Sequence, residues 1–146
     1  MRLERATIHD LTAVTDDQSA FWGGREMRHL HHPMYVHEFG DTALVARDGD
    51  GTIAGYLLGF VTVTGVGYVH IVGVRDTHRR RGIGGLMYGE FERLARAYGA
   101  RALKAITRPS NTGSIAFHRA IGFTATETPD YSGPGEMRIV LWRELV

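Results

Sequence analysis

The sequence predicts an α/β (α+β) fold built on a mixed, strongly twisted sheet of six to seven strands with helices on both faces. Short elements alternate in type along the chain, and three strands that look antiparallel precede a strand–helix–strand–helix unit. The length of 146 residues and the hydrophobic content of 43% suit one ordinary buried core. We therefore expect a single domain over residues 1–146.

The N-terminal part is predicted to be one strand followed by one helix. Leu3–Ile8 reads as the strand, and Asp10 is placed to cap a helix that runs toward Phe21. The segment Trp22–Glu38 then breaks the pattern, because it is dense in glycine, histidine and aromatic residues. It predicts only a short helix with loops.

Three strands are predicted next: Thr42–Arg47, Thr52–Val63 and Tyr68–Val74, the first two joined by the turn Asp48–Gly51. Ile53–Val74 carries no charge except at His70 and has the length of a membrane span. Its five glycines and its β-branched residues instead favour a buried hairpin.

The second half of the chain contains the clearest helix. Apolar residues from Gly82 to Tyr98 recur at three- and four-residue spacing, and Gly99 is positioned to end the helix. The remaining elements are a strand, a shorter helix and two closing strands: Ala102–Thr107, Asn111–Ile121, Phe123–Thr128 and Met137–Trp142.

Composition excludes several classes of function. The formal charge is +1, from 17 basic and 16 acidic residues, so no global field draws the chain to nucleic acid or to a membrane. The absence of cysteine excludes a thiol nucleophile, a disulfide framework and a cysteine zinc site. Met1–Asp10 lacks the apolar run of a signal peptide, so we expect a soluble, cytoplasmic protein.

The strongest chemical signal is the basic, glycine-rich turn Val72–Gly85, which joins a strand directly to the long helix. A helix start exposes backbone N–H groups, and glycines let a phosphate approach them. Arginines at 75, 79, 80 and 81 make this turn cationic, which favours a ligand with several phosphates. The motifs of ATP and dinucleotide sites are absent, and a solvated basic turn is the alternative.

Val74–Gly84 resembles the Arg/Gln-x-x-Gly-x-Gly/Ala signature of the GCN5-related N-acetyltransferases (GNAT), and the order of elements matches too. The resemblance implies one N-acetyltransferase domain, with acetyl-CoA as cofactor and a splay between the fourth and fifth strands. Backbone amides of the turn would hold the pyrophosphate, while the strand before it would pair with the pantetheine arm. The residues implied are Val72, Gly73, Val74, Arg79, Arg80, Arg81, Gly82, Ile83, Gly84 and Gly85.

A second motif lies on the short helix, where Asn111, Ser114 and His118 share one face. Read alone, Asn111 could simply cap the helix while His118 is solvated. In the family this pattern carries a tyrosine where His118 stands, and the segment most resembles the phosphinothricin acetyltransferase branch. The resemblance implies that all three residues contact the cofactor and that His118 either protonates the departing thiolate or hydrogen-bonds the pantetheine.

The acceptor amine needs a base, since it is mostly protonated at neutral pH. Tyr68, His70, Val72 and Val74 are expected to alternate onto one face of their strand. By resemblance, Tyr68 stands where some family members carry a glutamate base, and His70 stands where arylalkylamine acetyltransferases carry a histidine. His70 is the better candidate, with a buried structural histidine as the alternative. A backbone N–H near Val72 is the expected oxyanion donor.

The acceptor is expected opposite the cofactor, in an aromatic pocket that His31 and His32 also border. The residues of this pocket are Phe21, Trp22, His29, Tyr35 and Tyr131. No metal is expected, because no cysteine and no His-x-x-x-His pair supports one.

The sequence thus predicts direct acetyl transfer from acetyl-CoA to a primary amine, favouring a small molecule such as an amino acid, its analogue or an antibiotic. The alternatives are a protein N-terminal or lysine acetyltransferase, a non-catalytic acyl-CoA-binding module, and nucleic-acid binding through Arg79–Arg81. Neither a nucleic acid nor a membrane is expected as partner. Acceptor identity, acyl-chain preference and a homodimer are left open.

Overall fold

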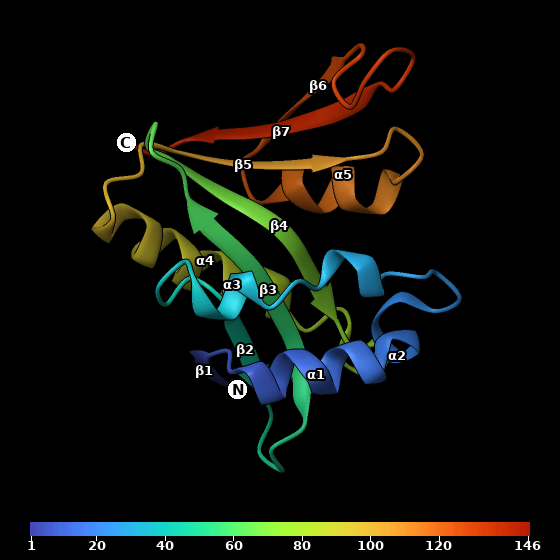
Figure 1. Ribbon diagram of the computed structural model, residues 1–146, viewed down its shortest axis with the longest axis vertical. Helices are drawn as coiled ribbons and strands as arrows, with labels where there is room; N and C mark the ends of the chain where they lie inside the picture. Colours follow the sequence, from blue (N-terminus) through green and yellow to red (C-terminus); the bar gives the residue numbers. More distant parts are fainter.

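A computed structural model describes residues 1–146 and contains a seven-stranded mixed sheet in the order β1-β2-β3-β4-β5-β7-β6 (Figure 1). Neighbouring strands are antiparallel except β4 and β5, which are parallel. The strands are β1 (Arg2–Arg5), β2 (Leu44–Arg47), β3 (Ile53–Val61), β4 (Val66–Val74), β5 (Ala102–Thr107), β6 (Thr124–Thr128) and β7 (Arg138–Glu144).

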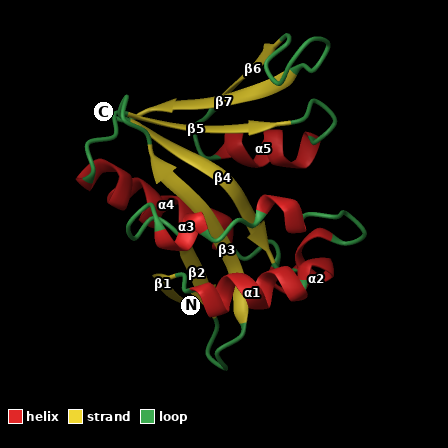
Figure 2. Ribbon diagram, in the orientation of Figure 1, coloured by secondary structure: helices red, strands yellow, loops and turns green.

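Helices lie on both faces of the sheet, as predicted (Figure 2). The front layer in this view holds α1 (Ile8–Asp16), α2 (Gln18–Trp22), α3 (Met34–His37) and the 3-10 turn η1 (Arg28–Leu30). The other face carries α4 (Ile83–Ala97) and α5 (Thr112–Ala120), and the 3-10 turn η2 (Asp76–His78) precedes α4. The predicted α/β class with a mixed sheet is confirmed.

Two hydrophobic cores follow from this layering. The larger core, of 17 residues, lies between the sheet and α4, around Phe91, Met87 and Leu103. The smaller one, of 13 residues, lies under the front helices, around Phe21 and Tyr56. The α4 side of the sheet and the front side of its β2–β3–β4 part are therefore each buried against helices.

The first helix begins earlier than predicted, because Thr7 and not Asp10 is its N-cap. The Thr7 hydroxyl accepts from the Asp10 amide at 3.2 Å, and the Asp10 carboxylate accepts from the Thr7 amide at 2.9 Å. This reciprocal pair is a capping box, with Asp10 at its third helical position. The helix also ends sooner, at Asp16, and α2 follows as a separate element.

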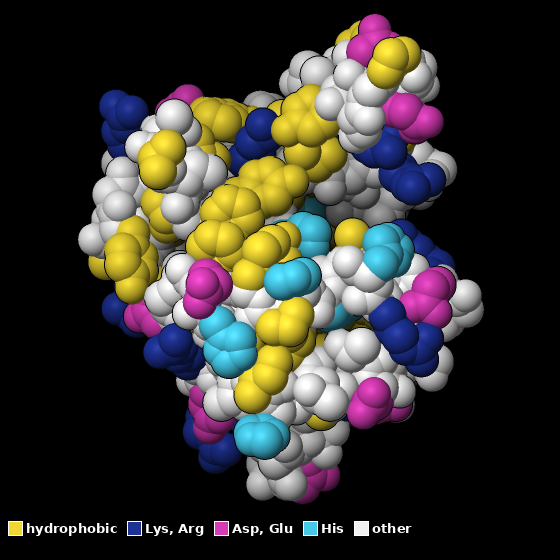
Figure 3. Space-filling view, viewed as in Figure 1, with side chains coloured by type: hydrophobic (Ala, Val, Ile, Leu, Met, Phe, Trp, Pro, Cys, Tyr) yellow, Lys and Arg dark blue, Asp and Glu magenta, His cyan; other side chains and the backbone are white.

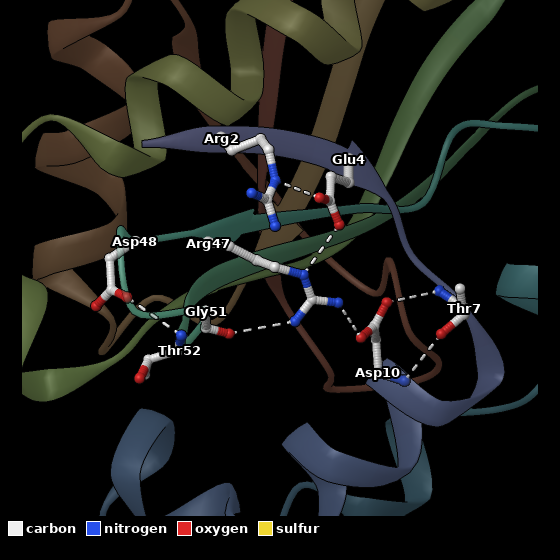
Figure 4. Close-up of polar contacts among 8 residues, drawn as sticks. All are labelled: Arg2, Glu4, Thr7, Asp10, Arg47, Asp48, Gly51 and Thr52. Carbon is white, nitrogen blue, oxygen red and sulfur yellow. Dashed lines mark hydrogen bonds and ion pairs between the residues drawn. The ribbon is translucent and has the colours of Figure 1, made fainter.

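A partly buried ion cluster fastens α1 to the first two strands (Figure 4). The Arg47 guanidinium, on β2, donates to Glu4 on β1 at 2.9 Å and to Asp10 on α1. These bonds to Arg47, together with those from Thr7, outweigh burial and lower the pKa of Asp10. The cluster holds the front helical layer in register with the sheet edge.

The uncharged stretch Ile53–Val74 forms β3 and β4, and a turn at Thr62–Gly65 joins them. This confirms the hairpin predicted there. No helix in the structure has the length and apolarity to cross a membrane.

Candidate functional site

The parallel strands β4 and β5 pair only along half of β4. Their register joins Val66–Val69 to Ala102–Ala105 and stops there. Beyond Val69, β4 runs on to Val74 while β5 diverges from it, which Figure 1 shows as a V between the two arrows. The β5-facing edge of residues 70–74 therefore has no strand partner and can accept an extended ligand.

A β-bulge lies where this opening begins. Leu58 pairs with Ile71 and Gly59 pairs with Val69, so His70 has no partner on β3. A bulge re-aims the side chains around it. The expectation that Tyr68, His70, Val72 and Val74 share one face is wrong, because the extra residue shifts the alternation.

The neighbours of these side chains show the shift. Val72 and Val74 pack against the core on the α4 side of the sheet. Tyr68 contacts Phe60, and His70 stacks on Tyr35, on the front side. Only the backbone of Val72, Gly73 and Val74 therefore faces the opening, through the free strand edge.

The turn between β4 and α4 is shaped for an anion. Arg80 and Gly82 both have left-handed backbones, with φ of 63° and 74°. The first backbone hydrogen bond of α4 runs from the Leu86 amide to Gly82, so the amides of residues 83–85 have no backbone partner. Turned amides at a helix start form a phosphate cradle.

The arginines of this turn divide into two roles. Arg79 donates to the carbonyls of Phe21 at 2.8 Å and Val74 at 3.4 Å, and Arg75 pairs with Asp17 at 2.6 Å. These two side chains tie α2 to the turn. Arg80 and Arg81 are exposed and make no side-chain ion pair, so they are the ones available to phosphates.

The glycines of the turn also divide. A Cβ on Gly82 or Gly85 would meet nothing within 4 Å, whereas a Cβ on Gly84 would lie 2.9 Å from the Phe117 ring. Gly84 therefore allows α4 to approach α5 closely, which is a packing role. Gly82 is needed for its positive φ.

His118 on α5 is buried in aromatic surroundings. Its Nδ1–H donates to the Ser114 carbonyl at 2.7 Å, and its Nε2 accepts from the Tyr88 hydroxyl of α4 at 2.6 Å. Burial lowers the pKa of His118, so the ring is neutral at pH 7. Both nitrogens are thus engaged, and the expected role as proton donor is not supported by these contacts.

Asn111 caps α5, since its side chain accepts from the Ser114 amide at 3.2 Å. Of the two readings of this residue, the structure shows the capping one. The stripe Asn111, Ser114 and His118 does share one side of the helix, where it turns toward α4 at His118. The Tyr88–His118 bond thus joins the two helices on the back of the sheet.

His70 is held with one nitrogen engaged. Its Nε2–H donates to the Leu30 carbonyl at 2.8 Å, and its ring stacks on Tyr35 with a centroid distance of 4.5 Å and a 9° interplanar angle. No hydrogen bond occupies Nδ1. Burial lowers the pKa of His70, so Nδ1 carries a free lone pair at neutral pH.

An aromatic surface surrounds His70 on the front of the sheet. Phe39 stacks on Phe60 with a ring-centroid distance of 4.7 Å, and the rings of Phe60 and Tyr68 have a centroid distance of 5.4 Å. Figure 3 shows hydrophobic side chains gathered in a band across the middle of this face, with histidines along its lower edge. Burial raises the pKa of Tyr68 to about 12, so this phenol keeps its proton at neutral pH.

The predicted aromatic pocket is only partly assembled. Tyr35 stacks on His70, and Tyr131 lies under the Lys104 ammonium, 5.1 Å from its ring centroid. Phe21 is 1% exposed and packs edge-on against Tyr56, so it belongs to the core. His29 and His32 are exposed.

Trp22 and His31 form a separate buried network. The Trp22 indole donates to the Tyr56 hydroxyl at 2.7 Å, which donates to His31 Nε2 at 2.6 Å, and His31 donates to the Met27 carbonyl. Each polar side-chain atom of Trp22, Tyr56 and His31 is thus hydrogen-bonded within the protein. This network supports the floor of the site, because Trp22 covers Gly73.

Sequence reasoning missed Phe39, Phe60, Tyr88 and Lys104. Phe60 alternates with Tyr56 and Leu58 on β3, which is a signal for a shared face. Tyr88 follows the apolar helical pattern and reads as core. Lys104 is the only lysine in the chain, and this feature can be read from the sequence alone. No group of three or more potential metal-binding side chains is present.

Comparison with known proteins gives a consistent result. The sequence model of the acetyltransferase (GNAT) family matches residues 11–123. No curated protein matches the chain by sequence.

Among solved structures, a GNAT-family protein from Desulfovibrio desulfuricans matches with TM-score 0.80 and 19% identity, covering 99% of each chain. A proposed phosphinothricin N-acetyltransferase matches with TM-score 0.71 and 20% identity, covering 99% of this chain and 98% of its own. The proposed acetyltransferase yncA from Salmonella typhimurium, solved with its cofactor acetyl-CoA, matches with TM-score 0.72 and 19% identity over 100% and 94%. Ribosomal-protein-alanine N-acetyltransferases also match. At these identities the matches show a shared fold.

Proposed function

Because the chain belongs to the GNAT acetyltransferase family, and is thus an acetyltransferase, we propose that it transfers acetyl from acetyl-CoA directly to a primary amine on a small molecule. The observation that carries this proposal is the bulge at the apex of the β4–β5 opening. It places a neutral histidine with a free Nδ1 at the point where a cofactor arm in the opening would end.

The residues of the opening fit acetyl-CoA. The unpaired amides at the start of α4 and the left-handed turn suit its pyrophosphate, with Arg80 and Arg81 as charge partners. The free edge of Val72–Val74 suits the amide groups of its pantetheine arm. When bound, acetyl-CoA supplies the acetyl group as a thioester.

His70 is the proposed base. Its Nδ1 removes one proton from the acceptor's ammonium, directly or through one water, and frees the nitrogen lone pair for attack on the thioester carbonyl. The C–N bond forms, the C–S bond breaks, and the departing thiolate takes up the second proton that the amine nitrogen loses as it becomes an amide. The apolar surroundings favour this transfer because desolvation also lowers the pKa of the ammonium. Tyr35 and Leu30 hold the ring in place during the transfer.

Tyr68 and His118 have other proposed roles. Tyr68 retains its proton and offers its hydroxyl as a hydrogen-bond donor at the apex. We assign His118 to positioning, because its bond to Tyr88 fixes α5 against α4 beneath the cofactor arm. A backbone N–H on the free edge near Val72 or Gly73 is the proposed oxyanion donor.

The test combines calorimetry with acetyl-CoA and an amine-panel assay that detects free thiol. His70→Gln keeps a donor for the Leu30 carbonyl but removes the base, so we expect kcat to fall about 10²- to 10⁴-fold with unchanged acetyl-CoA affinity. His37→Gln, at an exposed position on α3, is the control. No acetyl-CoA binding at tens of micromolar would refute the proposal, and binding without thiol release from any amine would indicate a non-catalytic binding module.

A second candidate is acetylation of a peptide N-terminus, and one observation favours it. A hollow of about 270 Å³ adjoins the aromatic surface at Phe39 and is also lined by Val61, Val63 and Tyr98. It could take a side chain that follows the reacting amine. Peptides beginning with different residues, included in the same amine panel, separate this candidate from the first.

A further inference from the structure

Lys104 occupies a singular place in this chain. It is the only lysine, whereas the other 16 of the 17 basic residues are arginines. It lies on β5, on the front face of the sheet, directly paired with Tyr68 of β4 and with Trp142 of β7. The pair Tyr68–Lys104 is one rung from the point where β4 and β5 separate. The lysine therefore stands at the apex of the proposed active site, on the acceptor side.

The charge of Lys104 has no acidic partner. None of the ion pairs in the structure includes it, although the side chain is only partly exposed. Its Nζ lies 5.1 Å from the centroid of the Tyr131 ring, in a cation–π contact. The nearest carboxylate along this face of β7, Glu144, accepts from the Trp142 indole at 3.0 Å. A half-buried ammonium without a counter-ion suits an anionic ligand.

The distance between Lys104 and the proposed base, His70, fits a small molecule. Strands lie about 4.8 Å apart and rise about 3.3 Å per residue, so the Cα atoms of Lys104 and His70 are about 8 Å apart. Both side chains are on the front of the sheet, beside Tyr68. A ligand between them would carry its amine and its anionic group within a few bonds.

Resting on the proposed function, we propose that Lys104 binds the carboxylate of the acceptor, so that the substrate class is a free amino acid or a similar amine that carries its own carboxylate. Tyr131, in the β6–β7 loop, covers the ammonium and limits its access to water. A peptide N-terminus lacks a carboxylate next to its amine. The proposal therefore favours the small-molecule acceptor over the peptide.

The kinetic test compares each common amino acid with its carboxamide, which keeps the side chain and lacks the negative charge. The lower amine pKa of the carboxamide acts equally on wild type and variants, so the change caused by each variant isolates the effect of the charge. We expect the wild type to prefer free acids. Lys104→Met should lower kcat/KM for free acids about 10- to 100-fold and leave the carboxamides unchanged, as expected for one lost charge-assisted bond. Lys104→Arg should retain part of the preference. Arg93→Met, which removes an exposed positive charge on α4, is the matched control.

Two kinetic outcomes would overturn the proposal. One is an equal decrease in kcat/KM for free acids and carboxamides in Lys104→Met. The other is that Lys104→Met changes the KM for acetyl-CoA and leaves the KM for the amine unchanged. Turnover of amines without any preference for the carboxylate would refute the role of Lys104 while leaving the proposed function intact.

A labelling test needs no turnover and no variant. Because Lys104 carries the only side-chain amine of the chain, an amine-acylating reagent followed by peptide mass spectrometry reports its accessibility directly. In the presence of coenzyme A, N-acetyl amino acids, which have no free amine to consume the reagent, should slow the labelling of Lys104, and their carboxamides should not. Equal labelling with both sets of compounds would overturn the proposal even if no acceptor is turned over.

Discussion

Removal of one hydroxyl group, in Tyr88→Phe, tests whether the Tyr88–His118 bond holds the two back helices together. Tyr88 is 2% exposed and its hydroxyl lies 2.6 Å from His118 Nε2. Phenylalanine would fill the same space but leave that nitrogen buried without a donor. A buried polar atom left without its partner costs about 1–3 kcal/mol, so we expect the free energy of unfolding to fall by about 2 kcal/mol.

Urea unfolding measures this change, and thermal unfolding should show a decrease in Tm of roughly 4–8 °C for a chain of this size. Tyr98→Phe is the matched control, because it removes an exposed hydroxyl that donates to Asp41 at 2.9 Å. Its effect should stay within about 0.5 kcal/mol. A cycle with His118→Phe should give a coupling energy of about 1–2 kcal/mol between the two positions.

Equal effects of Tyr88→Phe and Tyr98→Phe, or a coupling energy near zero, would refute this reasoning. The pair would then be two side chains that merely lie near one another. The turnover of Tyr88→Phe with saturating acetyl-CoA gives a second readout. If His118 is a positioning residue, the KM for acetyl-CoA should rise while the pH dependence of kcat stays that of the wild type.

Three further predictions concern stability. Burial lowers the pKa of His31, His70 and His118, so below about pH 6.5 the unfolded chain binds protons that the folded chain does not. As the pH is lowered, urea titrations should show the free energy of unfolding decreasing by up to about 1.4 kcal/mol per pH unit for each histidine. An unfolding midpoint that does not change between about pH 7.5 and 5.5 would contradict this. Gly84→Ala should cost about 1–3 kcal/mol by overpacking against Phe117, whereas Gly89→Ala on the same helix, where a Cβ meets nothing, should stabilise by up to about 1 kcal/mol; equal unfolding midpoints would argue against a packing role. Asp10→Ala removes a partner of Arg47 and the capping box and should cost about 3 kcal/mol in urea unfolding, while Arg2→Ala at the exposed end of the same cluster should be nearly neutral.

Much of the fold could be predicted because its signals are local. Periodicity placed α4 and β5 to within a residue or two, and the left-handed Gly82 stands where the basic turn needed a glycine. Element ends were less accurate where a cap decided them. Thr7 starts α1 through a reciprocal bond with Asp10, whereas the sequence pattern indicated Asp10 itself as the cap.

The sequence by itself determined the family signature, the basic glycine-rich turn before α4 and the presence of a histidine in the strand before that turn. Only the tertiary structure decided which way the side chains point. One extra residue at His70 reverses the alternation of β4, and a pattern of period two contains no record of such an insertion.

Long-range pairing decided the rest. Tyr88 and His118 are 30 residues apart, and Lys104 meets Tyr68 and Tyr131 from three separate segments. Their partners depend on how helices and strands pack, which no local pattern encodes. The sequence therefore identified the turn that would bind the cofactor, while packing decided which histidine keeps a free nitrogen and where the single lysine stands.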